Sequence, residues 1–262
     1  MKAAIDGATI EYEATGSGTA LLLLHAFPLG LFMWDAQVGA LAAACRVVRF
    51  DARGFGGSSL GEGPLTMERI ADDGAALLDH LGVEKAVVGG CSMGGYAALA
   101  FVRRHPQRLL GLVLQDTRAG ADTAEAKANR AGLAAKVLAE GSGAAVEAFL
   151  PKLLGETTRR EHPDLVARVG ERILAAAPEG IANALHGLAA RADSRETLPA
   201  IAVPALVLVG AEDVLTPPSE AALLSAAIPR ARLDVIPGAG HLANLESPAA
   251  VNAALRAFLA RV

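Results

Sequence analysis

The stretch AVVGGCSMGGYAALAFV, residues 86–102, decides the fold of this chain. Its first four residues form an apolar run typical of a buried strand, and its last seven favour a helix that stops before Pro106. Ser92 lies between these two elements, with Gly90 and Gly94 two residues to either side. A sharp turn from strand to helix leaves little room for side chains at those two positions. The stretch therefore predicts a strand, a tight turn that carries a serine, and a helix.

A second Gly-x-Ser-x-Gly spacing surrounds Ser59. The residues that close and follow it, GEGP at 61–64, cannot begin a helix, so we interpret Ser59 as a loop residue. At Ser92 the following helix N-terminus offers unpaired backbone N–H groups, which stabilise developing negative charge. Ser92 is therefore the candidate nucleophile, and we interpret its neighbour Cys91 as a small buried filler.

Short apolar runs alternate with helical patterns along the chain, which predicts an α/β fold with a mostly parallel sheet flanked by helices. We expect strands at residues 10–13, 20–24, 46–50, 86–89, 109–114, 205–209 and 233–236, the first of them antiparallel. From residue 118 to residue 198, helical spacing replaces the strand pattern. The sequence thus predicts a core of residues 1–117 and 199–262 with an inserted helical cap at 118–198. Pro151 is expected to break or kink a cap helix.

Composition and charge narrow the class of protein. The 262 residues are 52% hydrophobic and 20% charged, which excludes disordered and fibrous chains. A net charge of −4 provides no basic surface, so we expect neither nucleic acid nor a membrane as a partner. Two cysteines, Cys45 and Cys91, are too few for a disulfide framework. Because the N-terminus lacks a secretory pattern and no apolar run is long enough to span a bilayer, we expect a cytoplasmic location.

Two of the histidines, His25 and His241, lie where a predicted strand ends. His241 follows the flexible loop 237–240 at the carboxyl end of the last strand, which is where α/β sheets place reactive groups. We therefore favour His241 as the base that activates Ser92. His25 is interpreted as part of a structural turn.

The imidazole of a catalytic histidine needs a carboxylate to fix its tautomer. Asp213 follows the strand at 205–209, one strand before the histidine, and is favoured for this role. Its neighbour Glu212 is expected to point away. Asp116 remains a competitor, because it also ends a parallel strand.

Together these motifs resemble the α/β-hydrolase family, and within it the branch of small esterases, perhydrolases (non-haem haloperoxidase-like) and enol-lactonases. The resemblance is carried by LLHAFP at 23–28, FDARGFGGSS at 50–59, GCSMGG at 90–95, GAED at 210–213 and GAGH at 238–241. The chain order of serine, aspartate and histidine is also that of the family.

The resemblance implies that the backbone N–H groups of Phe27 and Met93 form an oxyanion hole. The family usually has glycine where this chain has Ala26, so the loop that presents the Phe27 N–H differs locally. Relatives that open carbon–halogen bonds or epoxides carry aspartate at the turn. The serine of this chain, Ser92, favours acyl transfer to water instead.

We predict a hydrolase that cleaves small to medium carboxylic esters or lactones through an acyl-enzyme on Ser92, with His241 as the base and Asp213 as the acid that orients it. We expect no metal and no cofactor, because the sequence carries no motif for either. The expected partner is the small-molecule substrate, and the sequence indicates no oligomeric state. A perhydrolase, a carbon–carbon bond hydrolase and a slow ligand-binding sensor remain alternatives.

The predicted cap is rich in Ala and Leu, which indicates an apolar pocket of modest size. Phe32, Met33 and Trp34 come just after the oxyanion loop and are expected to line this pocket. Trp34 suits equally well an anchor for the helix that follows it.

Overall fold

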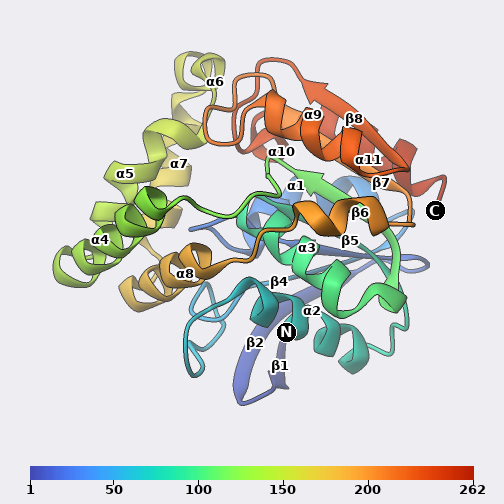
Figure 1. Cartoon of the computed structure of the whole chain (residues 1–262), viewed down its shortest axis with the longest axis horizontal. Coiled ribbons are helices and arrows are strands. Elements are labelled where there is room, and N and C mark those ends of the chain that lie inside the picture. Colours follow the sequence, from blue (N-terminus) through green and yellow to red (C-terminus); the bar gives the residue numbers. More distant parts are fainter.

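The computed structural model describes residues 1–262, and an eight-stranded sheet forms its centre (Figure 1). The strands are β1 (Lys2–Ile5), β2 (Ala8–Thr15), β3 (Ala20–Leu24), β4 (Arg46–Phe50), β5 (Ala86–Cys91), β6 (Leu109–Gln115), β7 (Ala205–Gly210) and β8 (Ala231–Ile236). Their order in the sheet is β1-β2-β4-β3-β5-β6-β7-β8, and all neighbours from β4 to β8 are parallel. β2 runs antiparallel to both β1 and β4. The predicted α/β fold with a mostly parallel sheet is confirmed.

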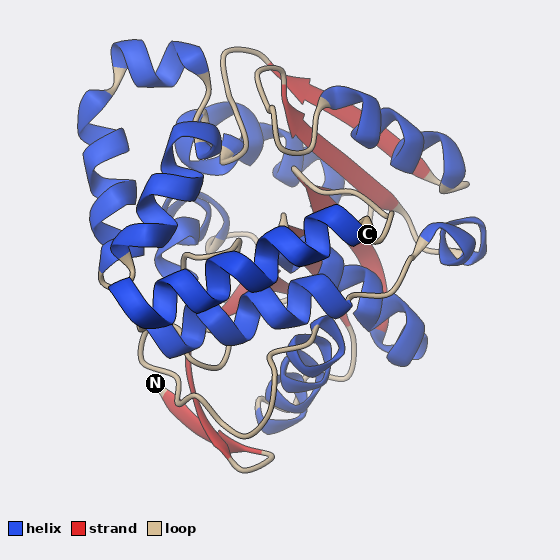
Figure 2. Ribbon diagram, turned by 60° about the vertical axis from the view of Figure 1, so that its left-hand side comes forward, coloured by secondary structure: helices blue, strands red, loops and turns tan.

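The central strands β3, β5 and β7 are buried along their whole length. Continuous apolar runs are typical of parallel strands that are covered on both faces. The hairpin of β1 and β2 lies at the periphery of the molecule, as Figure 2 shows, and turns through Asp6 and Gly7, which both have positive φ. β1 was not predicted, because four residues with alternating burial carry too short a pattern to be distinguished from a loop.

Helices cover the sheet. They are α1 (Asp35–Leu41), α2 (Met67–His80), α3 (Met93–Arg104), α9 (Pro218–Ala227), α10 (Ala243–Glu246) and α11 (Pro248–Leu259). α2 packs against α3, and α1 packs against α11. α3 also contacts β3, β5 and β6, so that most of its residues are buried in the centre of the molecule. Its small residues allow this close approach to the sheet.

Five further α-helices lie between β6 and β7, and we call them the helical segment. They are α4 (Ala124–Glu140), α5 (Gly143–Leu153), α6 (Glu156–Glu161), α7 (Pro163–Leu174) and α8 (Pro178–Ala190). They group on one side of the molecule, at the left of Figure 1, and α4 packs against α8. Pro151 does not break α5, which continues to Leu153. A proline in the last turn removes only one helical hydrogen bond, so the expected break is absent.

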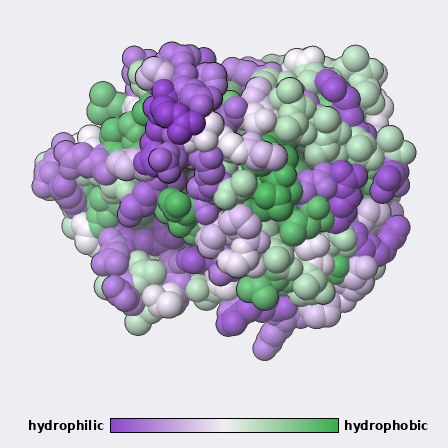
Figure 3. Space-filling model, turned by 90° about the horizontal axis from the view of Figure 1, so that it is seen from above, coloured by the Kyte–Doolittle hydropathy of each residue, from purple (hydrophilic) through white to green (hydrophobic).

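The surface mixes hydrophilic and hydrophobic residues over the face seen from above (Figure 3). No helix of the structure has the length and apolar character needed to cross a membrane.

Candidate active site

Ser92 occupies the turn between β5 and α3 with φ 53° and ψ −111°. A positive φ is uncommon for a residue other than glycine and is a source of local strain. A Cβ atom at Gly90 would lie 2.0 Å from the Gly94 carbonyl oxygen, and one at Gly94 would lie 2.1 Å from the Leu24 carbonyl oxygen. Both positions therefore require glycine, because any side chain there would collide with the backbone. The turn lifts the Ser92 side chain out of the sheet and places it at the N-terminus of α3.

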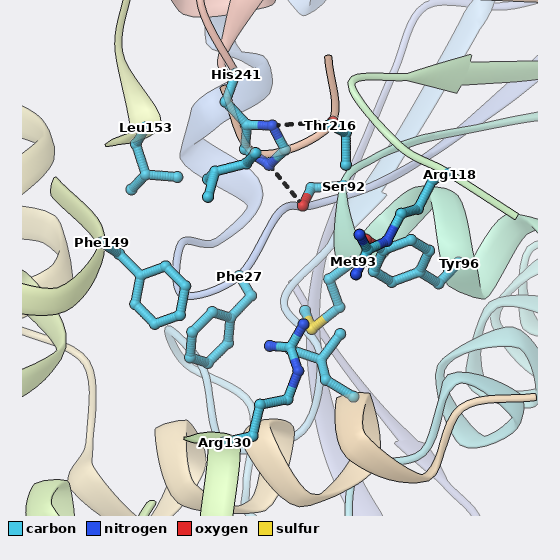
Figure 4. Close-up of a pocket in the computed structure, with 12 residues that line it drawn as sticks. Phe27, Ser92, Met93, Tyr96, Arg118, Arg130, Phe149, Leu153, Thr216 and His241 are labelled. Carbon is cyan, nitrogen blue, oxygen red and sulfur yellow. Dashed lines mark hydrogen bonds between the residues drawn. The ribbon is translucent and has the colours of Figure 1, made fainter. Parts of the chain in front are cut away.

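His241 follows β8 and reaches Ser92 across 149 residues of sequence. The distance from its Nε2 to the Ser92 Oγ is 2.7 Å, and the distance from its Nδ1 to the Asp213 Oδ2 is 2.8 Å. Figure 4 shows the imidazole pointing at the serine hydroxyl. A proton on Nδ1 is then donated to the carboxylate, which leaves Nε2 free to accept the hydroxyl proton. The structure thus brings Ser92, His241 and Asp213 together.

Asp213 is buried in the loop after β7. Its Oδ1 accepts hydrogen bonds from the backbone N–H groups of Leu215 at 2.8 Å and Thr216 at 3.0 Å, and its Oδ2 accepts one from the Thr216 hydroxyl at 2.7 Å. Burial by itself raises the pKa of Asp213. The hydrogen bond and charge interaction with His241, together with the Thr216 donors, outweigh burial and hold this pKa below its ordinary value. Asp213 is therefore ionised at neutral pH.

The competitor Asp116 forms a different set of contacts. Its Oδ1 accepts from the Gly210 N–H at 2.7 Å, and its Oδ2 accepts from Gln115 Nε2 at 3.1 Å and from the Ala243 N–H at 3.3 Å. Burial, followed by the charge of Asp213, raises its pKa well above the ordinary value. It forms no hydrogen bond with the site histidine, and instead ties β6 to β7 and to the start of α10.

Glu212 points away from the serine, in the direction expected from the sequence. Its Oε2 accepts from the Thr157 N–H at 2.8 Å, and its Oε1 accepts from the Thr157 hydroxyl at 2.5 Å. Glu246 makes a second link to the helical segment. Its Oε2 accepts from the Gly155 N–H at 2.7 Å, and its Oε1 accepts from the N–H groups of Gly240 and Leu242, on either side of the site histidine, at 2.9 and 3.1 Å. One carboxylate thus joins the histidine loop to the helical segment.

The rejected candidates have structural contacts. The Nε2 of His25 accepts from the Ala52 N–H at 2.9 Å, and burial lowers the pKa of this imidazole. Ser59 lies on the surface, where its hydroxyl accepts from the Thr9 N–H at 2.9 Å. Burial, followed by nearby carboxylates, raises the pKa of the Cys91 thiol well above its ordinary value. None of the three forms the serine–histidine arrangement found at the β5–α3 turn.

Two backbone N–H groups are available beside the serine. Met93 is the first residue of α3, so its N–H has no partner within the helix. The Phe27 N–H makes no hydrogen bond within the protein. Ala26 does not have a positive φ, and its N–H contacts the Met33 Sδ at 3.1 Å, so an alanine fits the backbone here without strain.

A cavity of about 120 Å³ opens at Ser92. Its lining comes from the core and from α4, α5 and α8 of the helical segment: Phe27, Ser92, Met93, Tyr96, Arg118, Arg130, Phe149, Leu153, Leu188, Leu215, Thr216 and His241. The modest size agrees with the prediction. The presence of Arg118 and Arg130 differs from the prediction, because the composition of the segment indicates an apolar pocket.

The assignment of Phe32, Met33 and Trp34 to this cavity is wrong, because none of the three lines it. They form a 3₁₀ helix, residues Leu31–Trp34, in which Met33 and Trp34 are fully buried. Phe32 instead lies under the Arg172 guanidinium, 4.7 Å from the ring centroid, at another cavity. Trp34 directly precedes α1, which fits the alternative role as an anchor for that helix.

Comparisons with known proteins identify the family of this chain. The family model described as alpha/beta hydrolase fold matches residues 19–248. The chain is 30% identical to 3-oxoadipate enol-lactonase 2 of Acinetobacter baylyi over 96% of this chain and 93% of that protein. It is 36% identical to the putative non-heme bromoperoxidase BpoC of Mycobacterium tuberculosis over 97% of this chain and 98% of that protein.

Solved structures give the same result. A thermophilic esterase from Thermogutta terrifontis, in a malate-bound form, has a TM-score of 0.95 at 46% identity and covers 97% of this chain and 94% of its own. The enol-lactonase from Burkholderia xenovorans LB400 has a TM-score of 0.92 at 31% identity, with coverages of 99% and 100%. The chain therefore belongs to the α/β-hydrolase family, in the branch that contains esterases, enol-lactonases and haloperoxidase-like proteins, and is a hydrolase.

Proposed function

We propose that this hydrolase cleaves carboxylic esters or lactones through an acyl-enzyme formed on Ser92. One observation carries the proposal: the His241 Nε2 lies 2.7 Å from the Ser92 Oγ while its Nδ1 is held by Asp213. A serine hydroxyl is a weak nucleophile until an oriented imidazole removes its proton. The relatives named as esterases and enol-lactonases support the same class of substrate.

In the proposed first step, the Ser92 Oγ attacks the scissile carbonyl carbon and its proton passes to the His241 Nε2. The carbonyl oxygen becomes an oxyanion and accepts hydrogen bonds from the N–H groups of Phe27 and Met93. The carbon–oxygen bond to the leaving alcohol then breaks, and the alcohol takes the proton from His241. In a lactone the alcohol stays attached to the acyl group.

In the second step a water molecule attacks the acyl carbon while His241 takes one of its protons. The bond to Ser92 breaks, the serine regains a proton from the imidazole, and the carboxylic acid leaves. The low pKa of Asp213 keeps it ionised throughout, so it stabilises the imidazolium formed in both steps.

We further propose that residues 118–198 act as a cap that sets substrate size over a core of residues 1–117 and 199–262. Phe149, Leu153 and Leu188 of the helical segment close the cavity opposite the core. A volume of about 120 Å³ favours short acyl groups and small lactones.

A perhydrolase is the second candidate, because a relative at 36% identity is named a putative non-heme bromoperoxidase. In that reaction hydrogen peroxide replaces water at the acyl-enzyme and a peracid leaves. The same residues serve both reactions. A peroxide-dependent halide oxidation assay that requires a carboxylic acid would distinguish them.

The test of the proposed function compares two serines that share the Gly-x-Ser-x-Gly spacing. Ser92→Ala should lower kcat for p-nitrophenyl acetate by about 10⁴-fold or more. Ser59→Ala, the matched control on the surface, should stay close to the wild type. Circular dichroism should be the same for all three proteins. Undiminished turnover by Ser92→Ala would refute the assignment of the nucleophile.

A further inference from the structure

The cavity beside Ser92 has one cationic wall. Arg118 comes from the loop after β6 and Arg130 comes from α4, and both line the cavity. Figure 4 shows their guanidinium groups near Met93, across from the apolar wall formed by Phe149. No carboxylate is among the residues that line this cavity. A ligand bound at the serine therefore meets positive charge on one side and apolar side chains on the other.

The positive charge of this wall exceeds what the protein neutralises. Arg118, Arg130 and Arg191 share one counter-ion, Asp122, whose side chain is completely buried. Its Oδ1 accepts from the Arg118 Nη2 at 3.0 Å and lies 2.7 Å from the Arg191 Nη1, and its Oδ2 accepts from the Arg130 Nε at 2.5 Å. None of the three arginines has another ion pair. Since arginine is always charged, the cluster keeps an excess of two positive charges.

Asp122 is ionised in this cluster. Burial by itself raises its pKa, but the hydrogen bonds and charges of Arg130 and Arg191 outweigh burial and hold the pKa below its ordinary value. The cluster is thus one anion among three cations, and any further anion that enters the cavity is attracted rather than repelled.

Arg118 and Arg130, the two arginines that line the cavity, keep hydrogen-bond donors that the protein does not use. Arg191 donates to the carbonyl oxygens of Leu188 and Gly120, and its guanidinium lies 4.2 Å from the ring centroid of Tyr96. The buried Nε of Arg191 has no partner, but Arg191 does not line the cavity. The buried Nε of Arg118 also has no partner, and neither Nη group of Arg130 donates to the protein. A buried charged donor without an acceptor is costly, as at the Arg118 Nε, and the unused donors of both cavity arginines fit an acceptor supplied by a ligand.

We propose that Arg118 and Arg130 bind a carboxylate of the substrate, so that the preferred substrates are esters or lactones that carry a free carboxylate group. The reaction itself rests on the function proposed for Ser92, whereas the binding depends only on the two arginines. Guanidinium groups pair with carboxylates through short, charge-assisted hydrogen bonds. Because the cavity is small, only a short chain separates this carboxylate from the scissile carbonyl.

The experiment uses two esters of the same shape, monomethyl glutarate, which is an anion, and methyl glutaramate, its neutral amide. Methanol release gives kcat/KM for each. The wild type should prefer the anionic ester by about 10- to 100-fold, the range expected for hydrogen bonds to charged groups. Arg130→Gln and Arg118→Gln should each reduce this preference about tenfold or more.

Matched controls separate this effect from damage to the fold. Each single variant leaves Asp122 with two of its three arginines, so we expect the fold to persist, which thermal unfolding would check. Arg160→Gln removes the same charge from an exposed position on α6 and should leave the preference unchanged. The proposal would be overturned if the wild type showed no preference for the anionic ester. It would also be overturned if both Arg118→Gln and Arg130→Gln retained this preference. An equal loss of kcat/KM for both esters would overturn it too. Such a loss would mean that the arginines assist the reaction itself and do not bind the carboxylate of the substrate.

A binding measurement distinguishes failure of this proposal from failure of the proposed function. Calorimetric titration of Ser92→Ala with glutarate should show binding that a second substitution, Arg130→Gln, weakens about tenfold or more. If neither ester is hydrolysed but glutarate binds in this way, the function of Ser92 is refuted and the carboxylate site stands. If the esters are hydrolysed but glutarate does not bind, the carboxylate site is refuted.

Discussion

The Asp213→Asn variant should lose almost all esterase activity while keeping its fold. In the wild type, the Asp213 Oδ2 accepts the Nδ1 proton of His241 at 2.8 Å. An asparagine that keeps the N–H donors of Leu215 and Thr216 on its Oδ1 must turn its NH₂ group toward the imidazole. The imidazole then carries its proton on Nε2, where it can no longer accept the proton of Ser92.

Loss of the correct tautomer in a serine–histidine–aspartate site lowers kcat by about 10⁴-fold. This corresponds to about 5.4 kcal/mol of transition-state stabilisation at 1.36 kcal/mol for each factor of ten. The matched control is Asp116→Asn, the same change at the end of the neighbouring strand. Because Asp116 does not contact the histidine, its replacement should cost about tenfold or less, or about 1.4 kcal/mol.

The assay is the steady-state hydrolysis of p-nitrophenyl acetate at a fixed pH near 8, with circular dichroism and thermal unfolding of each variant. Asp213→Asn should be at least roughly a hundred times less active than Asp116→Asn. The reverse ranking would move the acid to the end of β6. Equal activities would mean that neither carboxylate controls the imidazole.

Three further properties can be measured directly. Burial and the charge of Asp213 raise the pKa of Asp116 above its ordinary value of 3.8, so the folded state holds the Asp116 proton more tightly than the unfolded state does. The free energy of unfolding should therefore decline as pH rises above about 4. Denaturant titrations between pH 4 and pH 7 should show a smaller decline for Asp116→Asn, and identical slopes would contradict this. Gly94→Ala places a Cβ 2.1 Å from a carbonyl oxygen and should destabilise the fold by about 1–3 kcal/mol in thermal unfolding. Gly39→Ala, the control in open space on α1, should be neutral or stabilising. Equal Tm values for the two variants would show that the turn at Ser92 can relax. Iodoacetamide at pH 8 should label Cys91 only after unfolding, because burial raises the pKa of its thiol, and labelling of the native protein would disprove its protection.

The sequence was most informative where function depends on local geometry or on the ends of strands. The turn at Ser92 was predictable because it is local: a side chain at Gly90 or Gly94 would collide with nearby backbone atoms, and both glycines are visible in the sequence. Asp213 and His241 were predictable because residues that follow parallel strands meet at one edge of the sheet. The choice between Asp213 and Asp116 stayed open in the sequence, since both follow strands. Hydrogen bonding in three dimensions shows which of the two faces the imidazole.

Features that depend on packing between distant elements were not predictable. Phe32 was assigned to the cavity because it follows the oxyanion loop closely in sequence, but the chain turns into a 3₁₀ helix that leads away from the serine. Arg130 lies on a helix whose position against the core is set by tertiary contacts, and no periodicity reveals them. The sequence could have predicted Arg118 as a site residue, because it comes two residues after Asp116, at the same end of β6.

The two oxygens of Glu246 connect the helical segment to the loop that carries His241. One oxygen holds the helical segment at Gly155 and the other holds the backbone on either side of His241. A displacement of the segment at Gly155 would therefore break the hydrogen bond from Gly155 to Glu246 or shift the backbone that holds His241. Any rearrangement of the segment that keeps these hydrogen bonds must leave this corner in place.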